Sequence, residues 1–124
     1  MELIIRKCMK CGALVEVLND CNCENCGVQC CGETMRTFKP NAEDASFEKH
    51  LPVVEIDGNE IIATVPHVMD EDHYIEWIMM IAEGRVEKQV LEIGKPAQTS
   101  FPYVKGSKVY AYCNKHGLWS TDVK

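Results

Sequence analysis

The chain has 124 residues and a formal net charge of −6, from 13 basic and 19 acidic side chains. This length allows one domain, or one small domain beside a mini-domain. The acidic balance argues against a nucleic-acid-binding protein, which needs a basic face. No apolar run approaches the ~20 residues of a membrane span, and no secretory signal is recognisable, so we expect a cytoplasmic protein that has no membrane partner.

Cysteine is unusually frequent in the composition. Seven of the eight cysteines lie within the first 31 residues, the eighth is Cys113, and all four histidines follow the cysteine-rich segment. In a reducing compartment, clustered cysteines bind metal more often than they form disulfides. The sequence therefore predicts a metal domain over residues 1–38 and a second domain over residues 39–124, with residues 38–45, rich in Pro, Asn and acidic side chains, as the linker.

The N-terminal part contains a Cys-x-x-Cys-Gly pattern and an adjacent cysteine pair. About 38 residues cannot bury an adequate core, so such a domain needs a metal or disulfides. In a Cys-x-x-Cys knuckle the backbone N–H groups point at sulfur, and Gly12 permits the positive φ of the turn. Four thiolates suit tetrahedral iron or zinc. We predict an iron site, with structural zinc, or disulfides or free thiols, as alternatives; its ligands are Cys8, Cys11, Cys30 and Cys31.

Three further cysteines, Cys21, Cys23 and Cys26, lie between the two halves of this predicted site. Cys23 and Cys26 have the spacing of a knuckle of their own. A ligand set in which Cys26 replaces one of the adjacent pair therefore stays open, and the pattern assigns no role to the other two.

The rest of the chain consists of short β-prone segments separated by turns. The first two are joined by Asp-Gly-Asn and predict a hairpin. So many short strands with frequent turns favour a β-sandwich. A helix over residues 72–82 is the competing prediction. In chain order, the predicted strands are residues 53–56, 60–65, 74–82, 86–93, 97–104, 108–112 and 118–120.

Every histidine lies at the end of a predicted strand or in a turn. A lone histidine is usually a surface or satisfied core residue, and a lone buried cysteine is usually inert. A β-sandwich gathers its loops at its ends, however, and Cys113-x-x-His116 brings two ligand types within reach of one ion. Together these residues are stronger candidates for metal ligands than any of them alone; they are His50, His67, His73, Cys113 and His116.

Motifs in both parts resemble known iron proteins. Cys-x-x-Cys-Gly followed by Cys-Cys-Gly-Glu-x-Met is similar to desulforedoxin, a small iron–tetrathiolate module, although the three further cysteines depart from its usual short loop. The segments EKHLP, HVMDEDHYIEWI and CNKHGLW look like superoxide reductase, the iron domain of desulfoferrodoxin. Together they cover nearly the whole chain. The resemblance implies a mainly β protein, with a small desulforedoxin-like tetrathiolate metal domain followed by an immunoglobulin-like β-sandwich.

The resemblance also implies a chemistry and roles for individual residues. The activity is the one-electron reduction of superoxide to hydrogen peroxide without dioxygen production, an antioxidant detoxification. The iron has four equatorial nitrogens, from His50, His67, His73 and His116, and an axial sulfur from Cys113. Lys49 steers superoxide and helps deliver protons, and Glu48 can occupy the sixth position of ferric iron. Without the resemblance, Glu48 and Lys49 read as solvated surface charges.

The resemblance suggests partners for the protein, and two other functions stay open as alternatives. The resemblance implies a rubredoxin-like electron donor and a homodimer. One alternative is a rubredoxin-like electron-transfer protein in which the C-terminal metal is only structural. Another is a zinc-stabilised interaction protein without a redox role. The acidic residues 70–72 read as a solvated loop, with a calcium site as a weaker alternative.

Overall fold

The computed structural model describes residues 2–23 and 27–124. Their contacts form two compact units, a head unit (Glu2–Lys39) and a body unit (Pro40–Lys124). The structure is mainly β, as the sequence predicts. No helix in the described residues is both long and apolar enough to cross a membrane.

The head unit is built from very short strands around a few apolar side chains. Three strands pair antiparallel in the order β2-β1-β5, and β3 pairs with β4 as a separate hairpin. Such short strands bury little surface, so most of the stability of this unit must come from another source. The strands are β1 (Ile5–Lys7), β2 (Leu14–Glu16), β3 (Gln29–Cys30), β4 (Glu33–Thr34) and β5 (Arg36–Phe38). The buried side chains are Leu3, Ile5, Cys8, Met35 and Phe38.

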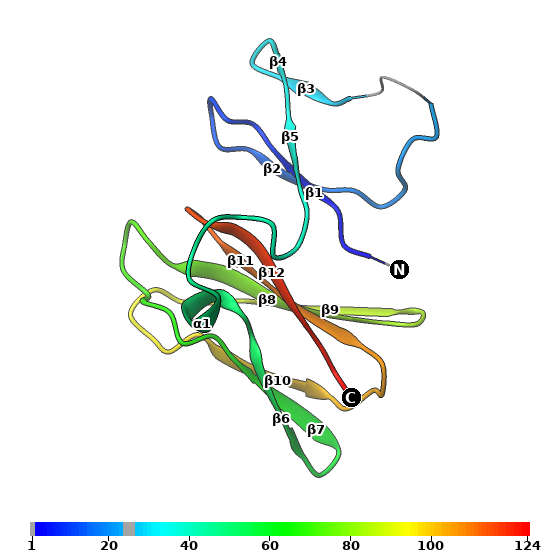
Figure 1. Cartoon of the computed structure of the whole chain (residues 1–124), viewed down its shortest axis with the longest axis vertical. Coiled ribbons are helices and arrows are strands. Elements are labelled where there is room, and N and C mark those ends of the chain that lie inside the picture. The colour runs from blue at the N-terminus through cyan, green and yellow to red at the C-terminus, as the bar shows by residue number, and fades with distance from the viewer. Residues whose placement is uncertain (1, 24–26) are drawn as a thin grey trace. The chain divides into compact units, whose positions relative to one another are not determined.

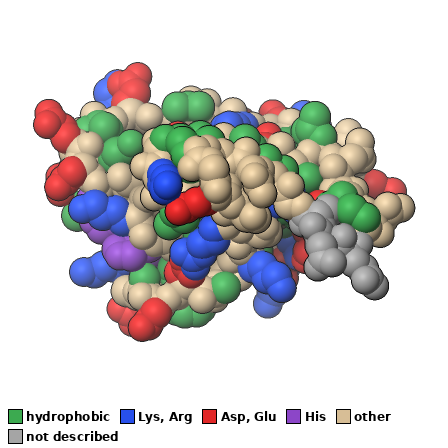
Figure 2. All heavy atoms as spheres, turned by 90° about the horizontal axis from the view of Figure 1, so that it is seen from above, with side chains coloured by type: hydrophobic (Ala, Val, Ile, Leu, Met, Phe, Trp, Pro, Cys, Tyr) green, Lys and Arg blue, Asp and Glu red, His purple; other side chains and the backbone are tan. Residues whose placement is uncertain are grey.

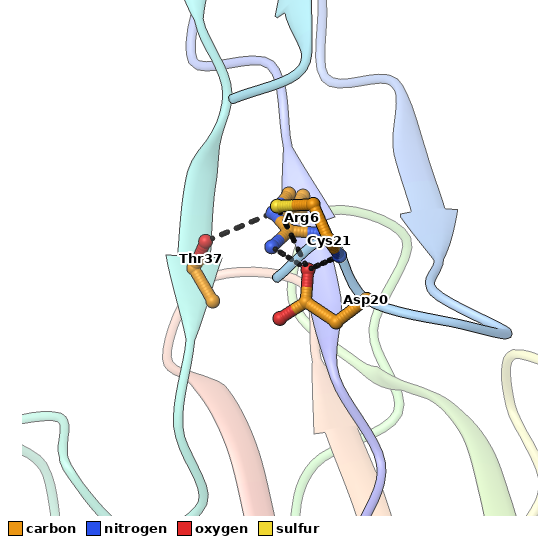
Figure 3. A network of polar contacts seen from close by, with 4 residues as sticks. All are labelled: Arg6, Asp20, Cys21 and Thr37. Atoms are coloured by element: carbon orange, nitrogen blue, oxygen red, sulfur yellow. Dashed lines mark hydrogen bonds and ion pairs between the residues drawn. The ribbon is translucent and has the colours of Figure 1, made fainter. Parts of the chain in front are cut away.

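A polar network links the loop after β2 to the three-stranded sheet of the head unit (Figure 3). The Arg6 guanidinium on β1 donates to Thr37 Oγ1 on β5 (3.1 Å) and to Asp20 Oδ1 in the loop (2.9 Å). The backbone N–H of Cys21 donates to the same carboxylate oxygen (2.9 Å). These bonds to Asp20 lower the pKa of its carboxyl group, with the Arg6 contact as the largest cause.

The body unit is a sandwich of two antiparallel sheets (Figure 1). A three-stranded sheet has the order β10-β7-β6, and a four-stranded sheet has the order β12-β11-β8-β9. Alternate residues of β7, β8 and β11 fill the space between them, including Ile61, Ile78 and Val109, which are fully buried. The strands are β6 (Val53–Asp57), β7 (Glu60–Thr64), β8 (Ile75–Ala82), β9 (Arg85–Val90), β10 (Gln98–Pro102), β11 (Lys108–Cys113) and β12 (Gly117–Asp122).

The competing helix over residues 72–82 is wrong. Strand β8 is a central strand of its sheet, and Met80 pairs with Val109 on β11 and with Glu87 on β9. Nearly every residue of β8 is buried, so both of its faces are apolar. An apolar run of this kind has neither the period of a surface strand nor that of a helix, and the two neighbouring strands decide its conformation.

A short helix, α1 (Phe47–His50), was not predicted from the sequence. It ends where Leu51 becomes extended, since a residue before proline disfavours the helical region. The segment that carries α1 is held at both ends. Asn41 accepts from the Ser120 N–H (2.9 Å), its own N–H donates to the Leu118 carbonyl (2.9 Å), and Thr121 Oγ1 donates to the Pro52 carbonyl (2.6 Å). Part of the expected linker is therefore ordered against β12.

Candidate metal centres

Five side chains of the body unit converge on one point, and they are the five that the sequence singled out. Their ligand atoms all lie within 4.8 Å of one another. Each comes from a different position in the fold: the end of α1, the loop after β7, the loop before β8, the end of β11, and the turn before β12. In that order, they are His50, His67, His73, Cys113 and His116.

The spacing of these atoms fits a single metal ion. His116 Nδ1 lies 3.1 Å from His50 Nε2 and 3.3 Å from His73 Nε2. Cys113 Sγ lies 3.5 Å from His67 Nε2 and 3.8 Å from His116 Nδ1. Two nitrogens that each bind an ion at ~2.1 Å and at right angles to each other would lie ~3.0 Å apart. Four imidazoles and one thiolate in this arrangement suit a redox-active transition metal such as iron.

Hydrogen bonds to the backbone hold two of the imidazoles in the required tautomer. His50 Nδ1–H donates to the Ser46 carbonyl (2.7 Å), and His67 Nδ1–H donates to the Val68 carbonyl (2.6 Å). In each ring the Nε2 lone pair therefore faces the centre. Burial lowers the pKa values of His50, His67 and His73, which favours the neutral form that a metal ligand needs.

Trp119 supports this arrangement. Trp119 is fully buried. Its ring also stacks on His50 (centroids 4.9 Å apart, 24° between planes), and its Nε1–H donates to the His116 carbonyl (3.0 Å). One side chain thus contacts two candidate ligands. His50 and Trp119 are 69 positions apart in the sequence, so no local pattern predicts their contact.

A cavity of about 360 Å³ opens over the imidazoles. Lys49, Val68 and the four histidines line it, whereas the fully buried Cys113 does not. The sulfur therefore lies on the interior side of the centre and the imidazoles on the open side. Figure 2 shows histidine side chains at the surface beside Lys or Arg side chains. The charge of Lys49 adds to burial in lowering the pKa values of His50 and His67.

Glu48 and the acidic run lie outside this cavity. Glu48 is exposed on α1 and does not line the cavity. In residues 70–72, Asp70 forms a tight turn with His73, and Asp72 lies 4.0 Å from Lys115 Nζ at the surface. Among the described residues, the acidic run belongs to neither group of potential metal ligands. Calcium binding there stays a prediction.

The predicted thiol cluster forms in the head unit. Cys11 Sγ lies 3.7 Å from Cys30 Sγ, which lies 3.9 Å from Cys31 Sγ. Tetrahedral thiolates at ~2.3 Å from an ion would lie ~3.8 Å apart, so the spacing fits one metal. Cys31 adopts φ 53°, a conformation that lets two adjacent cysteines face the same point. Cys8 completes the set.

The protonation of these thiols is linked. The Cys11 N–H donates to Cys8 Sγ (3.4 Å), as expected for a knuckle, and lowers the pKa of the Cys8 thiol to about 6. The neighbouring sulfurs, with Cys8 first, raise the pKa of Cys30 to about 12. Without a cation, four thiols this close cannot all ionise. A bound metal ion supplies the charge that would let them do so.

The three further cysteines of the head unit differ from this cluster. Cys23 is an exposed free thiol, and Cys21 is disulfide-bonded. Cys26 lies outside the described residues, so the ligand exchange that involves it stays a prediction. A hollow of about 490 Å³ beside Arg6 and Leu18 contains none of the candidate metal ligands of either unit.

Comparisons with known proteins agree with this geometry. The sequence model of the desulfoferrodoxin family matches residues 42–122. The chain is 42% identical to the desulfoferrodoxin of Syntrophotalea carbinolica, with 98% of this chain and 97% of the relative covered. It is 39% identical to that of Nitratidesulfovibrio vulgaris (95% and 94% covered). The structure is similar to the superoxide reductase from Treponema pallidum, with TM-score 0.73, 27% identity, and 98% and 99% of the two chains covered.

Proposed function

Because the chain belongs to the desulfoferrodoxin family, we propose that it is a superoxide reductase whose reaction takes place at the centre of the body unit. The reaction is superoxide + one electron + two protons → hydrogen peroxide, and it forms no dioxygen. The observation that carries this proposal is the set of four imidazoles and one thiolate beneath a cavity that Lys49 borders. The similarity to a solved superoxide reductase supports it.

In this proposal, the five side chains would hold iron, which would supply single electrons and a place for a small ligand. The four neutral imidazoles and the Cys113 thiolate leave a ferrous centre with a net charge of about +1, which attracts an anion. The Cys113 thiolate, which is buried and does not line the cavity, would donate electron density to such a metal. That donation would favour the loss of an electron to a small oxidant.

Lys49 and Glu48 have different roles in the proposal. The chain carries a net charge of −6, which repels superoxide at long range. A cation at the cavity provides local attraction, and Lys49 can also pass protons to the product through water. Glu48 would have to turn towards the cavity to serve as a further ligand after turnover, since its side chain is exposed on α1.

The tetrathiolate cluster of the head unit is proposed to hold a second iron. Its sulfur spacing fits zinc equally well, and metal analysis with an absorption spectrum of the oxidised protein distinguishes the two. The cytoplasmic location, the homodimer and the rubredoxin-like electron donor stay predictions from the sequence and the family resemblance.

The stoichiometry of the reaction tests the function. Reduced protein mixed with superoxide under anaerobic conditions should form one hydrogen peroxide for each superoxide consumed, with no dioxygen, while the body centre is oxidised. Dismutation would give half as much peroxide, with dioxygen. If the protein binds iron in the body unit but does not react with superoxide, the proposal is contradicted and the electron-transfer alternative is favoured.

A further inference from the structure

Asn114 lies between the two candidate ligands of the β11–β12 turn and binds both neighbours of a third. Its Oδ1 accepts from the Tyr74 N–H (3.0 Å), and its Nδ2 donates to the Asp72 carbonyl (3.0 Å). Its backbone N–H donates to the Tyr74 carbonyl (3.2 Å). Three hydrogen bonds from one residue therefore bracket His73.

These bonds come where the regular pairing of the sheet breaks. Along β8 and β11, Tyr112 pairs with Trp77 but Cys113 pairs with Ile75, so the register shifts between Tyr112 and Cys113. Beyond the shift, a side-chain amide can continue the ladder, because it carries the same donor and acceptor as a peptide group. Asn114 does this for the loop that precedes β8.

We propose that Asn114 is a positioning residue of the body centre, which sets the place of His73 relative to Cys113 and His116. A metal site tolerates only a few tenths of an ångström of error in its ligands. The exposed ion pair of Asp72 and Lys115, at 4.0 Å, also links these segments, and pairs of this kind contribute little. The hydrogen bonds of Asn114 are therefore the stronger of these two links.

The inference rests on the proposed iron site but not on the superoxide reaction, so metal affinity tests it directly. Asn114→Ala should weaken Fe²⁺ binding at the body centre about tenfold or more, measured by competition with a chelator. The thiolate-to-iron absorption of the oxidised body centre should shift as well. The spectrum of the head cluster should not change, and it serves as the internal reference.

Two further variants separate positioning from general stability. Asn114→Leu keeps the number and branching of the side-chain heavy atoms but loses both side-chain bonds, and it should weaken iron binding as much as Asn114→Ala. Val109→Ala removes fully buried volume from β11, and Val109 is not one of the five candidate ligands. It should lower the melting temperature while iron affinity stays within about twofold of wild type. Equal affinity in Asn114→Ala and wild type, or equal losses in Asn114→Ala and Val109→Ala, would overturn the proposal.

Hydrogen exchange in the metal-free wild-type protein gives a test that needs no variant to fold. The Tyr74 amide proton and the Asn114 Nδ2 protons should exchange slowly, since both groups are hydrogen-bonded. Rapid exchange of both would show that Asn114 does not form these hydrogen bonds with the loop before β8. If the body unit bound no iron at all, the proposed function would fail, and this measurement would still show whether Asn114 holds the loop before β8.

Discussion

Cys113 differs from the other candidate ligands of the body unit in its surroundings as well as its chemistry. It is fully buried, whereas the four imidazoles line the cavity. A thiolate is a stronger electron donor than an imidazole, and here it lies on the side away from any incoming ligand. A change at this residue should therefore alter the electronic properties of the metal more than its accessibility.

Cys113→Ser should abolish the reaction with superoxide. A serine oxygen is a harder and weaker donor, and its hydroxyl stays protonated where a thiolate forms readily. The oxidised body centre should also lose its sulfur-to-iron absorption, while the head cluster keeps its own. Stopped-flow or pulse-radiolysis rates together with the spectrum check this prediction. Turnover of the Cys113→Ser variant at the wild-type rate would contradict the proposed role of Cys113.

Lys49 and Lys115 form a matched pair of cations near the same centre. Both are exposed, but only Lys49 lines the cavity. Lys115 lies 4.0 Å from the carboxylate of Asp72, which offsets its charge. At physiological salt the Debye length is ~8 Å, so only a cation close to the reacting position retains its full effect.

Lys49→Ala should slow the second-order reaction with superoxide about tenfold, which corresponds to ~1.4 kcal/mol. Its rate should also depend less on salt concentration, because an attractive charge is gone. Lys115→Ala is the control, and its rate should remain within about twofold of wild type. Pulse radiolysis at two salt concentrations measures both. Equal rates and equal salt slopes for wild type and Lys49→Ala would return Lys49 to an ordinary surface charge.

Among the elements, the segment that carries α1 is held in place by tertiary contacts. A helix of four residues gains almost nothing from its own hydrogen bonds. Asn41 at one end and Pro52 at the other are bonded to β12. Asn41 adopts φ 60°, a left-handed conformation that asparagine tolerates better than most residues. These contacts bring His50 to the centre and Lys49 to the cavity.

Two substitutions at Asn41 should separate its hydrogen bonds from its backbone conformation. Asn41→Gly loses the side-chain bonds but accepts the positive φ, and it should lower the free energy of unfolding of the body unit by about 1–2 kcal/mol. Asn41→Ala should be more destabilising, because alanine is also strained at this φ. Denaturant unfolding measures both. A more stable alanine variant would contradict this account of the residue.

Some elements of the body unit could be predicted from the sequence, and others could not. The β7 segment was predictable because its β-branched and apolar residues follow an Asp-Gly turn. The β8 segment was predicted as a strand with a helix as the competing prediction, since its apolar run has no clear period and its neighbouring strands decide its conformation. α1 was not predictable, since four residues have no periodicity and its position depends on contacts with β12. The five ligands stood out by residue type and spacing. The roles of Trp119 and Asn114 arise only when distant segments meet, so no local pattern reveals them.

At the scale of the whole molecule, the head and body units depend on different sources of stability. The body unit buries a continuous apolar core between two sheets. In its described residues, the head unit has strands of two or three residues and five buried side chains of the kinds that form a core. For a domain of this size, metal binding is a large part of the folding free energy.

Cys31→Ser should therefore remove the tetrathiolate absorption and unfold or loosen the head unit, while the body unit keeps its melting transition and its iron. Cys23→Ser is the matched control, because Cys23 is an exposed thiol outside the cluster. It should retain the wild-type spectrum. Calorimetry with metal analysis of both variants distinguishes the units. Loss of body iron in Cys31→Ser would show that the two units are not independent.

The position of the body ligands along the chain has a consequence for biosynthesis. All four thiols of the head cluster lie within the first 31 residues, whereas the body centre needs Cys113 and His116 as well as His50. A ribosome makes the first set early, and domains at the N-terminus of a chain can fold during synthesis. The head cluster can take up its metal while the chain is still growing. The body centre cannot be complete until the β11–β12 hairpin has emerged, so a metal bound there would arrive at a later stage, when nearly the whole sandwich is available to receive it.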